Sequence, residues 1–204
     1  MSEFEKMLQG KIYDCTDEEI KPLRAKAHRL CFDYNKLYED DPKREEILEE
    51  LLGYKTNNVY FQGPIQFDYG FNFHVGKNFF CNFNFVCLDV SPIYVGDNVF
   101  FGPNVSIVNP VHPLIAKERN MYQKEDGVLT DKEYSKPITI GSNCWLASNV
   151  TVAGGVTIGE GCVIGAGSVV VKDIPPHSLA AGNPCKVIRT ITEKDSIYLK
   201  KELF

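Results

Sequence analysis

The sequence predicts a mainly β protein, a parallel β-helix of hexapeptide repeats with a small N-terminal helical segment and a long excursion loop. Three observations indicate this fold: an apolar side chain recurs at every sixth residue, a small residue usually follows it, and the same spacing appears in two blocks upstream. The clearest apolar run is Ile140, Leu146, Val152, Ile158, Ile164 and Val170. A period of six suits neither a helix nor an alternating strand, but it suits a triangular coil with three hexapeptides to the turn.

The residues between these apolar positions fit the corners of such a coil. Those that follow the apolar residue are mostly small, namely Gly141, Ala147, Ala153, Gly159 and Gly165, with Val171 as the exception. A third set is small or β-branched, namely Cys144, Val150, Val156, Cys162, Ser168 and Ile174. We therefore expect the apolar residue to fill the axis of the coil and the small residue to let the backbone turn.

The upstream blocks keep the same frame but contain two departures from it. They consist of Val75, Cys81 and Cys87, and of Val95, Phe101 and Ile107. The frame slips by two residues around Ser91 and Pro92, and a polar stretch from about 110 to 137 separates the second block from the third. Repeat proteins usually place function at such departures, because the coils themselves are nearly alike.

The N-terminal segment, residues 1–55, has a helical pattern. Thr16 and Glu19 predict a capping box, and apolar residues then recur at helical spacing through Leu37. A second helix is expected to begin at Asp41 and Pro42 and to end at Gly53. Residues 1–55 would cap the coils or add a wall to a substrate site, 56–190 would form the β-helix, and 191–204 a tail.

Composition excludes several classes of protein. The net charge of −5 and the lack of a concentrated basic stretch argue against nucleic acid as a partner. No apolar run approaches ~20 residues and the start of the chain lacks signal-peptide features, so we expect a soluble cytoplasmic protein with no membrane partner. Of the seven cysteines, four fall in the repeat pattern (Cys81, Cys87, Cys144 and Cys162), which favours core filling.

His112 is the histidine best placed for catalysis. It ends a hexapeptide block, precedes Pro113 and opens the long polar stretch. An imidazole can take a proton from a bound hydroxyl near neutral pH. For the other histidines we expect packing or surface roles: His28 on a helix, His74 among aromatic residues and His177 in a turn.

Over nearly its full length the chain resembles the maltose/galactoside-type sugar O-acetyltransferases of the hexapeptide-repeat acyltransferase superfamily. The matching segments are LRAK (23–26), NFN (82–84), LDV (88–90), VHPL (111–114), ERN (118–120), PITIG (137–141), NVTV (149–152), IGAGSVV (164–170), KDIPP (172–176) and AAGNPCKVIR (180–189). The resemblance implies a left-handed parallel β-helix and a homotrimer with active sites between subunits.

The resemblance also implies direct transfer of an acetyl group from acetyl-CoA to a hydroxyl of a sugar such as maltose, glucose or a galactoside, with no metal required. His112 would be the general base, and the acceptor would be bound by Asp14, Asp68, Asn82 and Asp89. Carboxylates and amides suit a polyol, because they make several hydrogen bonds at fixed spacing. Val90 stands where galactoside-type members are expected to carry another acid, which weakens a galactoside assignment. Whether Asp89 orients His112 or holds the acceptor stays open.

The resemblance also places the coenzyme along the C-terminal coils, with Trp145 and Ser148 beside it. Its phosphates require cations and its pantetheine arm a smooth groove. The residues assigned to it are Trp145, Ala147, Ser148, Gly165, Ala166, Val171, Lys172, Lys186 and Arg189. The backbone N–H of Ser148 would face the thioester oxygen, where negative charge develops.

Three alternatives to this function are open to a chain of this fold. A γ-class carbonic anhydrase needs three histidines around zinc, which this chain cannot easily supply. An acetyltransferase of the same fold could act on serine, an antibiotic or an amine. A noncatalytic scaffold would be expected to lack the histidine or the basic C-terminal residues, and both are present. The long loop after His112 would fold over a neighbouring subunit's cleft and shape the acceptor pocket.

Overall fold

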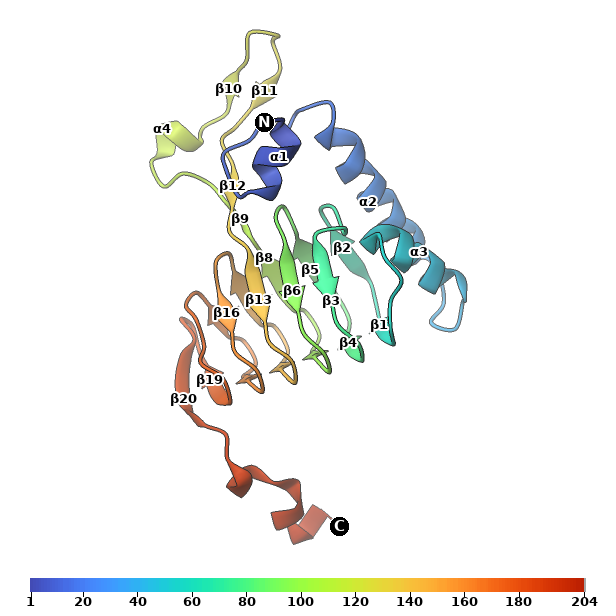
Figure 1. Cartoon of the computed structure of the whole chain (residues 1–204), viewed down its shortest axis with the longest axis vertical. Coiled ribbons are helices and arrows are strands. Elements are labelled where there is room, and N and C mark those ends of the chain that lie inside the picture. The colour runs from blue at the N-terminus through green and yellow to red at the C-terminus, as the bar shows by residue number, and fades with distance from the viewer. Residues whose placement is uncertain (204) are drawn as a thin grey trace.

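The computed structural model describes residues 1–203 and shows a stack of triangular coils with a helical cap at one end and an extended C-terminal tail at the other (Figure 1). The predicted parallel β-helix is confirmed. The cap consists of α2 (Ile20–Tyr34) and α3 (Lys43–Leu52), and α1 (Glu3–Leu8) lies over the corner loops beside the excursion (Figure 1). The tail holds three short 3₁₀ turns, η1 (Glu193–Asp195), η2 (Ile197–Leu199) and η3 (Lys201–Leu203).

Three sheets form the faces of the prism, and consecutive strands move from one face to the next. The first face contains β1 (Val59–Phe61), β4 (Phe79–Cys81), β7 (Phe100–Phe101), β14 (Trp145–Leu146), β17 (Val163–Ile164), β19 (Ser178–Ala181) and β20 (Lys186–Thr190). The second face contains β2 (Ile65–Phe67), β5 (Phe85–Leu88), β8 (Ser106–Val108), β15 (Thr151–Ala153) and β18 (Val169–Val170). The third face contains β3 (Phe73–Val75), β6 (Ile93–Val95), β13 (Ile138–Ile140) and β16 (Thr157–Ile158). Below, the first corner joins the first and second faces, the second corner joins the second and third, and the third corner joins the third and first.

The excursion, residues 110–135, leaves the coils at the second corner and returns there. It contains β9 (Pro110–Val111), α4 (Ala116–Arg119), β10 (Tyr122–Gln123), β11 (Leu129–Thr130) and β12 (Tyr134–Ser135). Strands β9 and β12 pair antiparallel as its stem, and β10 and β11 form a hairpin beyond it. The hairpin projects past the coils on the side of the N-terminus (Figure 1).

The strand register explains the slip in the sequence frame. Phe73 pairs with Ile93, and Thr139 pairs with Thr157. More residues separate the first pair than the second, so the coil after Phe73 is longer than the coil after Thr139. The additional residues widen the second corner, at the predicted slip around Ser91 and Pro92. The same widening occurs one coil earlier, at residues 68–72, where the sequence analysis did not detect it.

The axis of the prism is filled as predicted. None of the six residues of the main apolar run is more than 1 % exposed. The coils nearest the cap are filled instead by six buried phenylalanines, Phe61, Phe67, Phe73, Phe79, Phe85 and Phe101. The four repeat cysteines are buried and free, and burial raises the pKa of each thiol. Their core-filling role is therefore confirmed, because a buried protonated thiol packs as a small apolar group.

Asparagine ladders run along two corners and were not predicted. At the third corner Asn58, Asn78, Asn98 and Asn143 have φ between 54° and 60°, and each side-chain amide donates to the next at 2.8 to 3.2 Å. A shorter ladder at the first corner joins Asn84, Asn104 and Asn149. Asparagine tolerates the left-handed region better than most side chains, so it can turn the corner and bond the next coil.

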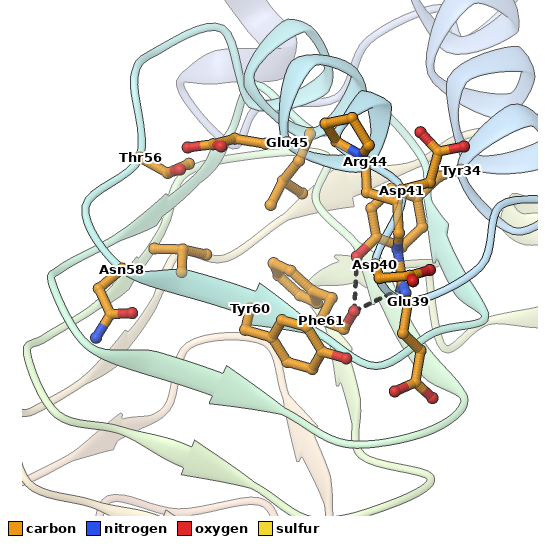
Figure 2. Close-up of a pocket in the computed structure, with 13 residues that line it drawn as sticks. Tyr34, Glu39, Asp40, Asp41, Arg44, Glu45, Thr56, Asn58, Tyr60 and Phe61 are labelled. Carbon is orange, nitrogen blue, oxygen red and sulfur yellow. Dashed lines mark hydrogen bonds between the residues drawn. The ribbon is translucent and has the colours of Figure 1, made fainter.

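The cap is held to the first coil by two side chains that converge on one carbonyl. The Tyr34 hydroxyl and Arg44 Nη2 both donate to Phe61 O, at 2.6 and 2.8 Å (Figure 2). The Arg44 guanidinium also lies 4.3 Å from the centroid of the Tyr34 ring. A cavity of about 360 Å³ beside them is rimmed by Glu39, Asp40, Asp41 and Glu45.

The helical predictions are confirmed except for one cap. Helix α3 begins just after Pro42, and Gly53 ends it with a φ of 79°. The capping box predicted at Thr16 and Glu19 is wrong, because both the backbone N–H and the hydroxyl of Thr16 donate to Asp14 Oδ1. Helix α2 starts at Ile20 without a side-chain cap. Helix α1 was not predicted, although its cap at Ser2 and Glu5 has the spacing of a capping box.

No helix within residues 1–203 combines the length and the apolar character that crossing a membrane requires.

Candidate active site

Three segments of the chain meet at the second corner, beside the excursion. They are the N-terminal residues 13–16, the widened corner loops around Asp68 and Asp89, and the ends of the excursion. The stem pairs Val111 with Tyr134, so His112 and Glu133 follow directly beyond it. An isolated antiparallel bridge joins Tyr13 to Glu133. The N-terminal segment thus contributes to the wall of the site, while α2 and α3 cover the end of the coils (Figure 1).

The surroundings of His112 determine which ring nitrogen carries the proton. Nδ1 lies 3.2 Å from Lys132 O and 3.1 Å from Asp131 Oδ2. A carbonyl oxygen can only accept, so the neutral ring must carry its proton on Nδ1 and its lone pair on Nε2. The side chain is 43 % exposed, and Nε2 lies 3.7 Å from Glu133 Oε2. The arrangement provides an accessible base at Nε2.

Asp131 and Glu133 are the site residues that the sequence analysis missed. Glu133 accepts a hydrogen bond from the buried hydroxyl of Tyr13. Burial raises the pKa of Glu133, and the contacts with Tyr13 and His112 only partly offset this. The sequence feature that could have indicated them is the D-K-E run just before the repeats resume. Within a charged loop, such a run is typical of residues exposed to solvent.

Asp14 fastens the N-terminal segment to the hairpin of the excursion. Its Oδ1 accepts from Thr16 and from the Thr130 hydroxyl, and its Oδ2 accepts from Lys124 Nζ at 2.7 Å. Burial alone would raise the pKa of Asp14, but the hydrogen bonds from Lys124, Thr16 and Thr130 outweigh it and hold the pKa well below its usual range. The carboxylate is therefore charged and already engaged within the chain.

Asp89 is fully buried and anchors the widened corner loop. Its Oδ1 accepts from Tyr69 N at 2.9 Å and its Oδ2 from Asn72 N at 3.3 Å. The Asn72 side chain donates back to Asp89 O at 2.8 Å. Burial raises the pKa of Asp89 to about 8. Asp89 has no hydrogen bond to His112, and the carboxylates that contact the histidine are those of Asp131 and Glu133.

Asp68 lies in the widened corner loop one coil before Asp89 and closer to the surface. Its Oδ1 is 3.9 Å from His28 Nε2. Burial raises the pKa of Asp68, and the charges of His28 and Arg24 offset part of that effect. Asp68, unlike Asp89, keeps part of its side chain accessible to a ligand.

The burial of Asp89 predicts a specific pH dependence of stability. Its pKa is about 3.9 in an unfolded chain and about 8 in the folded one, so the folded state holds this proton across that interval. The free energy of unfolding should fall as pH rises from about 4 to about 8. Asp89→Asn keeps an acceptor for Tyr69 N and should flatten this fall, with a difference on the order of a few kcal/mol at pH 8.

Thermal unfolding at several pH values between 4.5 and 8 measures this difference. Asp40→Asn, at an exposed loop position, is the matched control and should leave the slope unchanged. Equal slopes for Asp89→Asn and the parent chain would contradict the prediction.

Three of the residues predicted for the coenzyme, Trp145, Lys186 and Arg189, lie on strands of the first face. Trp145 pairs with Val163, Val163 with Leu179 and Leu179 with Arg189, so these four side chains form one row on the same side of the sheet. Trp145 is 51 % exposed, which places its ring on the outer surface rather than in the core. Lys186 is exposed on the same last strand. Arg189 makes two hydrogen bonds to Asp195, at 2.6 and 2.8 Å.

Small residues line the first corner beside this row. Ala147 and Gly165 stack in successive coils, and a Cβ on Gly165 would come within 2.8 Å of the Ala181 side chain. Within residues 1–203 the backbone N–H groups of Ser148 and Ala166 make no hydrogen bond. Two unpaired donors therefore lie at this edge.

The predicted residues do not meet within one chain. Asn82, Ala147, Ser148, Gly165 and Ala166 occupy the first corner, after strands of the first face. A different group occupies the second corner, namely Asp68, Asp89, His112, Val171 and Lys172. The second face lies between the two groups, so a single chain holds the two halves of the predicted site at different edges.

Comparison with known proteins identifies the family. A family model described as the maltose acetyltransferase hexapeptide capping motif matches residues 6–55, and one described as the bacterial transferase hexapeptide (six repeats) matches 137–172. The galactoside O-acetyltransferase of Escherichia coli K12 is 38 % identical over 202 residues, covering 97 % of this chain and 94 % of that protein. The chain belongs to the hexapeptide-repeat sugar O-acetyltransferase family.

Solved structures of this family share the fold. A maltose O-acetyltransferase from Clostridium difficile 630 is 42 % identical, with a TM-score of 0.80 over 95 % of this chain and 99 % of the other. A galactoside acetyltransferase in complex with coenzyme A is 38 % identical, with a TM-score of 0.86 over 96 % and 94 % of the two chains. The two family models correspond to the cap and to the coils after the excursion, whereas neither covers residues 110–135.

Proposed function

We propose that this member of the sugar O-acetyltransferase family transfers the acetyl group of acetyl-CoA to a hydroxyl of a sugar such as maltose, glucose or a galactoside, with His112 as general base. The observation that carries the proposal is the ring of His112, whose Nδ1 faces two acceptors while Nε2 keeps its lone pair. The acceptor oxygen attacks the thioester carbon as Nε2 takes its proton. Collapse of the tetrahedral intermediate breaks the C–S bond, and the protonated histidine returns the proton to the departing thiolate.

The acceptor is proposed to lie at the second corner, among polar groups that suit a polyol. Asp68 is partly accessible there, and Asp14 holds the adjoining segment with a charged carboxylate. Asp89 would act mainly by shaping the corner loop, since both of its oxygens accept backbone N–H groups. Asn82 would approach from the first corner of another subunit.

The coenzyme is proposed to follow the first face and first corner. Trp145 and the small residues Ala147 and Gly165 offer a smooth apolar surface for the pantetheine arm, and Ser148 and Ala166 offer free N–H donors. The Ser148 N–H would stabilise the developing oxyanion. Lys186 and Arg189 would meet the phosphates at the end of the row, with Val171 and Lys172 beside them from the second corner.

A homotrimer would unite the two halves of the site. Because His112 and Ser148 lie at different corners, a closed ring of subunits that places the second corner of one beside the first corner of the next would complete each site. A symmetric trimer forms three such sites. The complex of coenzyme A with the related galactoside acetyltransferase supports the choice of coenzyme.

A thiol-release assay with acetyl-CoA tests the proposed function. Maltose, glucose, galactosides, serine, chloramphenicol and a simple amine are offered in parallel, and release is expected with one or more of the sugars. Release with only serine, chloramphenicol or the amine would overturn the acceptor class. Absence of release with every acceptor would contradict the enzymatic function and favour a noncatalytic scaffold.

A further inference from the structure

We infer that Asp131, delivered by the excursion, is the positioning residue that holds the His112 imidazole and stabilises its charged form during the reaction. The inference rests on the proposed function, since it gives Asp131 a role in that same site. It concerns a residue in the excursion, which neither matched family model covers.

The geometry around Nδ1 is the first support. Asp131 Oδ2 lies 3.1 Å from Nδ1, and Lys132 O lies 3.2 Å from the same atom. Lys132 O accepts the hydrogen bond from Nδ1–H, which fixes the tautomer, and the Asp131 carboxylate lies within ion-pair distance of the same nitrogen. Of these two groups only Asp131 carries a negative charge, so it stabilises the imidazolium that forms when Nε2 takes a proton.

The position of Asp131 is itself fixed by its neighbours. Thr130, the preceding residue, is 1 % exposed and its hydroxyl donates to Asp14 Oδ1 at 2.9 Å. Lys124, which follows the first strand of the hairpin, donates to Asp14 Oδ2 at 2.7 Å. These two hydrogen bonds hold the hairpin to the N-terminal segment immediately beside Asp131. They therefore restrict the positions that the Asp131 carboxylate can take.

The charged groups around His112 come from more than one element. Asp131 faces Nδ1, and Glu133 faces Nε2 at 3.7 Å. From the N-terminal segment the Tyr13 hydroxyl donates to Glu133, and from the corner loop Asp68 acts on the same carboxyl through its charge. Because Tyr13 engages Glu133, and because Asp131 Oδ2 lies nearer to the ring at 3.1 Å from Nδ1, Asp131 is the carboxylate best placed to orient the imidazole.

Asp131→Asn tests the role, with Asp126→Asn as the matched control. Asp126 is an exposed acid on the same hairpin that contacts Lys124 but not His112. Asp131→Asn keeps the size of the side chain and removes its charge. We expect a roughly 10-fold loss of kcat, with little change in the KM for the sugar or for acetyl-CoA. The loss should be no larger, because Lys132 O still fixes the tautomer of the ring.

A second measurement does not depend on activity. The NMR signals of the His112 ring protons should move in Asp131→Asn relative to the parent chain, because a negative charge 3.1 Å from Nδ1 is removed. Asp126→Asn should match the parent chain in both experiments. Unchanged ring signals in Asp131→Asn would overturn the inference even if the protein proved inactive with every acceptor. Moved signals in a chain without sugar acetylation would uphold the contact and reject only the proposed function.

Discussion

His112→Ala is expected to reduce kcat/KM for sugar acetylation by about 10²- to 10⁴-fold, the range for loss of a general base. The side chain lies at the accessible end of the excursion stem, and the ionisable groups that contact its ring there are the carboxyls of Asp131 and Glu133. The loss should appear in kcat, because the proposed role of the histidine is proton transfer during the reaction and not binding of either substrate. Thiol release measured at saturating acetyl-CoA gives the value.

His177→Asn is the matched control for His112→Ala. His177 lies in a turn of the coils with a φ of 54°, a conformation that asparagine adopts readily. This variant should retain nearly full activity and the parent's thermal stability. If His112→Ala kept more than about a tenth of the parent's kcat/KM, the assigned base would be wrong and Glu133, 3.7 Å from the same ring nitrogen, would become the candidate.

The coils could be predicted because one physical requirement repeats along them. Each axial position must fill the same narrow prism, so Ile140 and its equivalents recur at a fixed interval and identify the fold without any long-range information. His112 could be predicted as a candidate base because it ends such a block. The widening at residues 68–72 escaped detection because it begins after Phe67, within an aromatic segment where both axial and lateral positions are apolar.

The partners of His112 could not be predicted because they depend on how the excursion folds back. Asp131 and Glu133 lie near the end of the excursion whereas His112 lies near its start, and no repeat relates them. Their placement follows from the stem that pairs Val111 with Tyr134 and from the hydrogen bonds to Asp14. The hydrogen bonds to Asp14 also explain why the predicted capping box does not form. The Thr16 hydroxyl donates to Asp14 and is therefore not available to cap α2.

Ser148→Pro is expected to lower kcat by about 10²- to 10³-fold through the loss of one backbone N–H, the cost of removing an oxyanion donor. The chain itself shows that proline fits there: Phe101 pairs with Leu146, which puts Pro103 at the corresponding corner position one coil earlier. The Ser148 N–H has no acceptor within residues 1–203, so its removal should cost little stability. Ser148→Ala, which keeps the N–H, should retain activity. A fully active Ser148→Pro protein would reject the oxyanion role.

Subunits carrying His112→Ala and Ser148→Pro should restore each other's activity when they are unfolded and refolded together. In a trimer whose sites take His112 from one chain and Ser148 from the next, an equal mixture leaves about one quarter of the sites with both groups intact. Each variant alone has no such site. If both groups acted within one chain, mixing would restore nothing, because every chain would carry one of the two defects. Recovery of activity in the mixture therefore distinguishes a shared site from a site within one chain, and the two separate corners that carry His112 and Ser148 favour the shared arrangement.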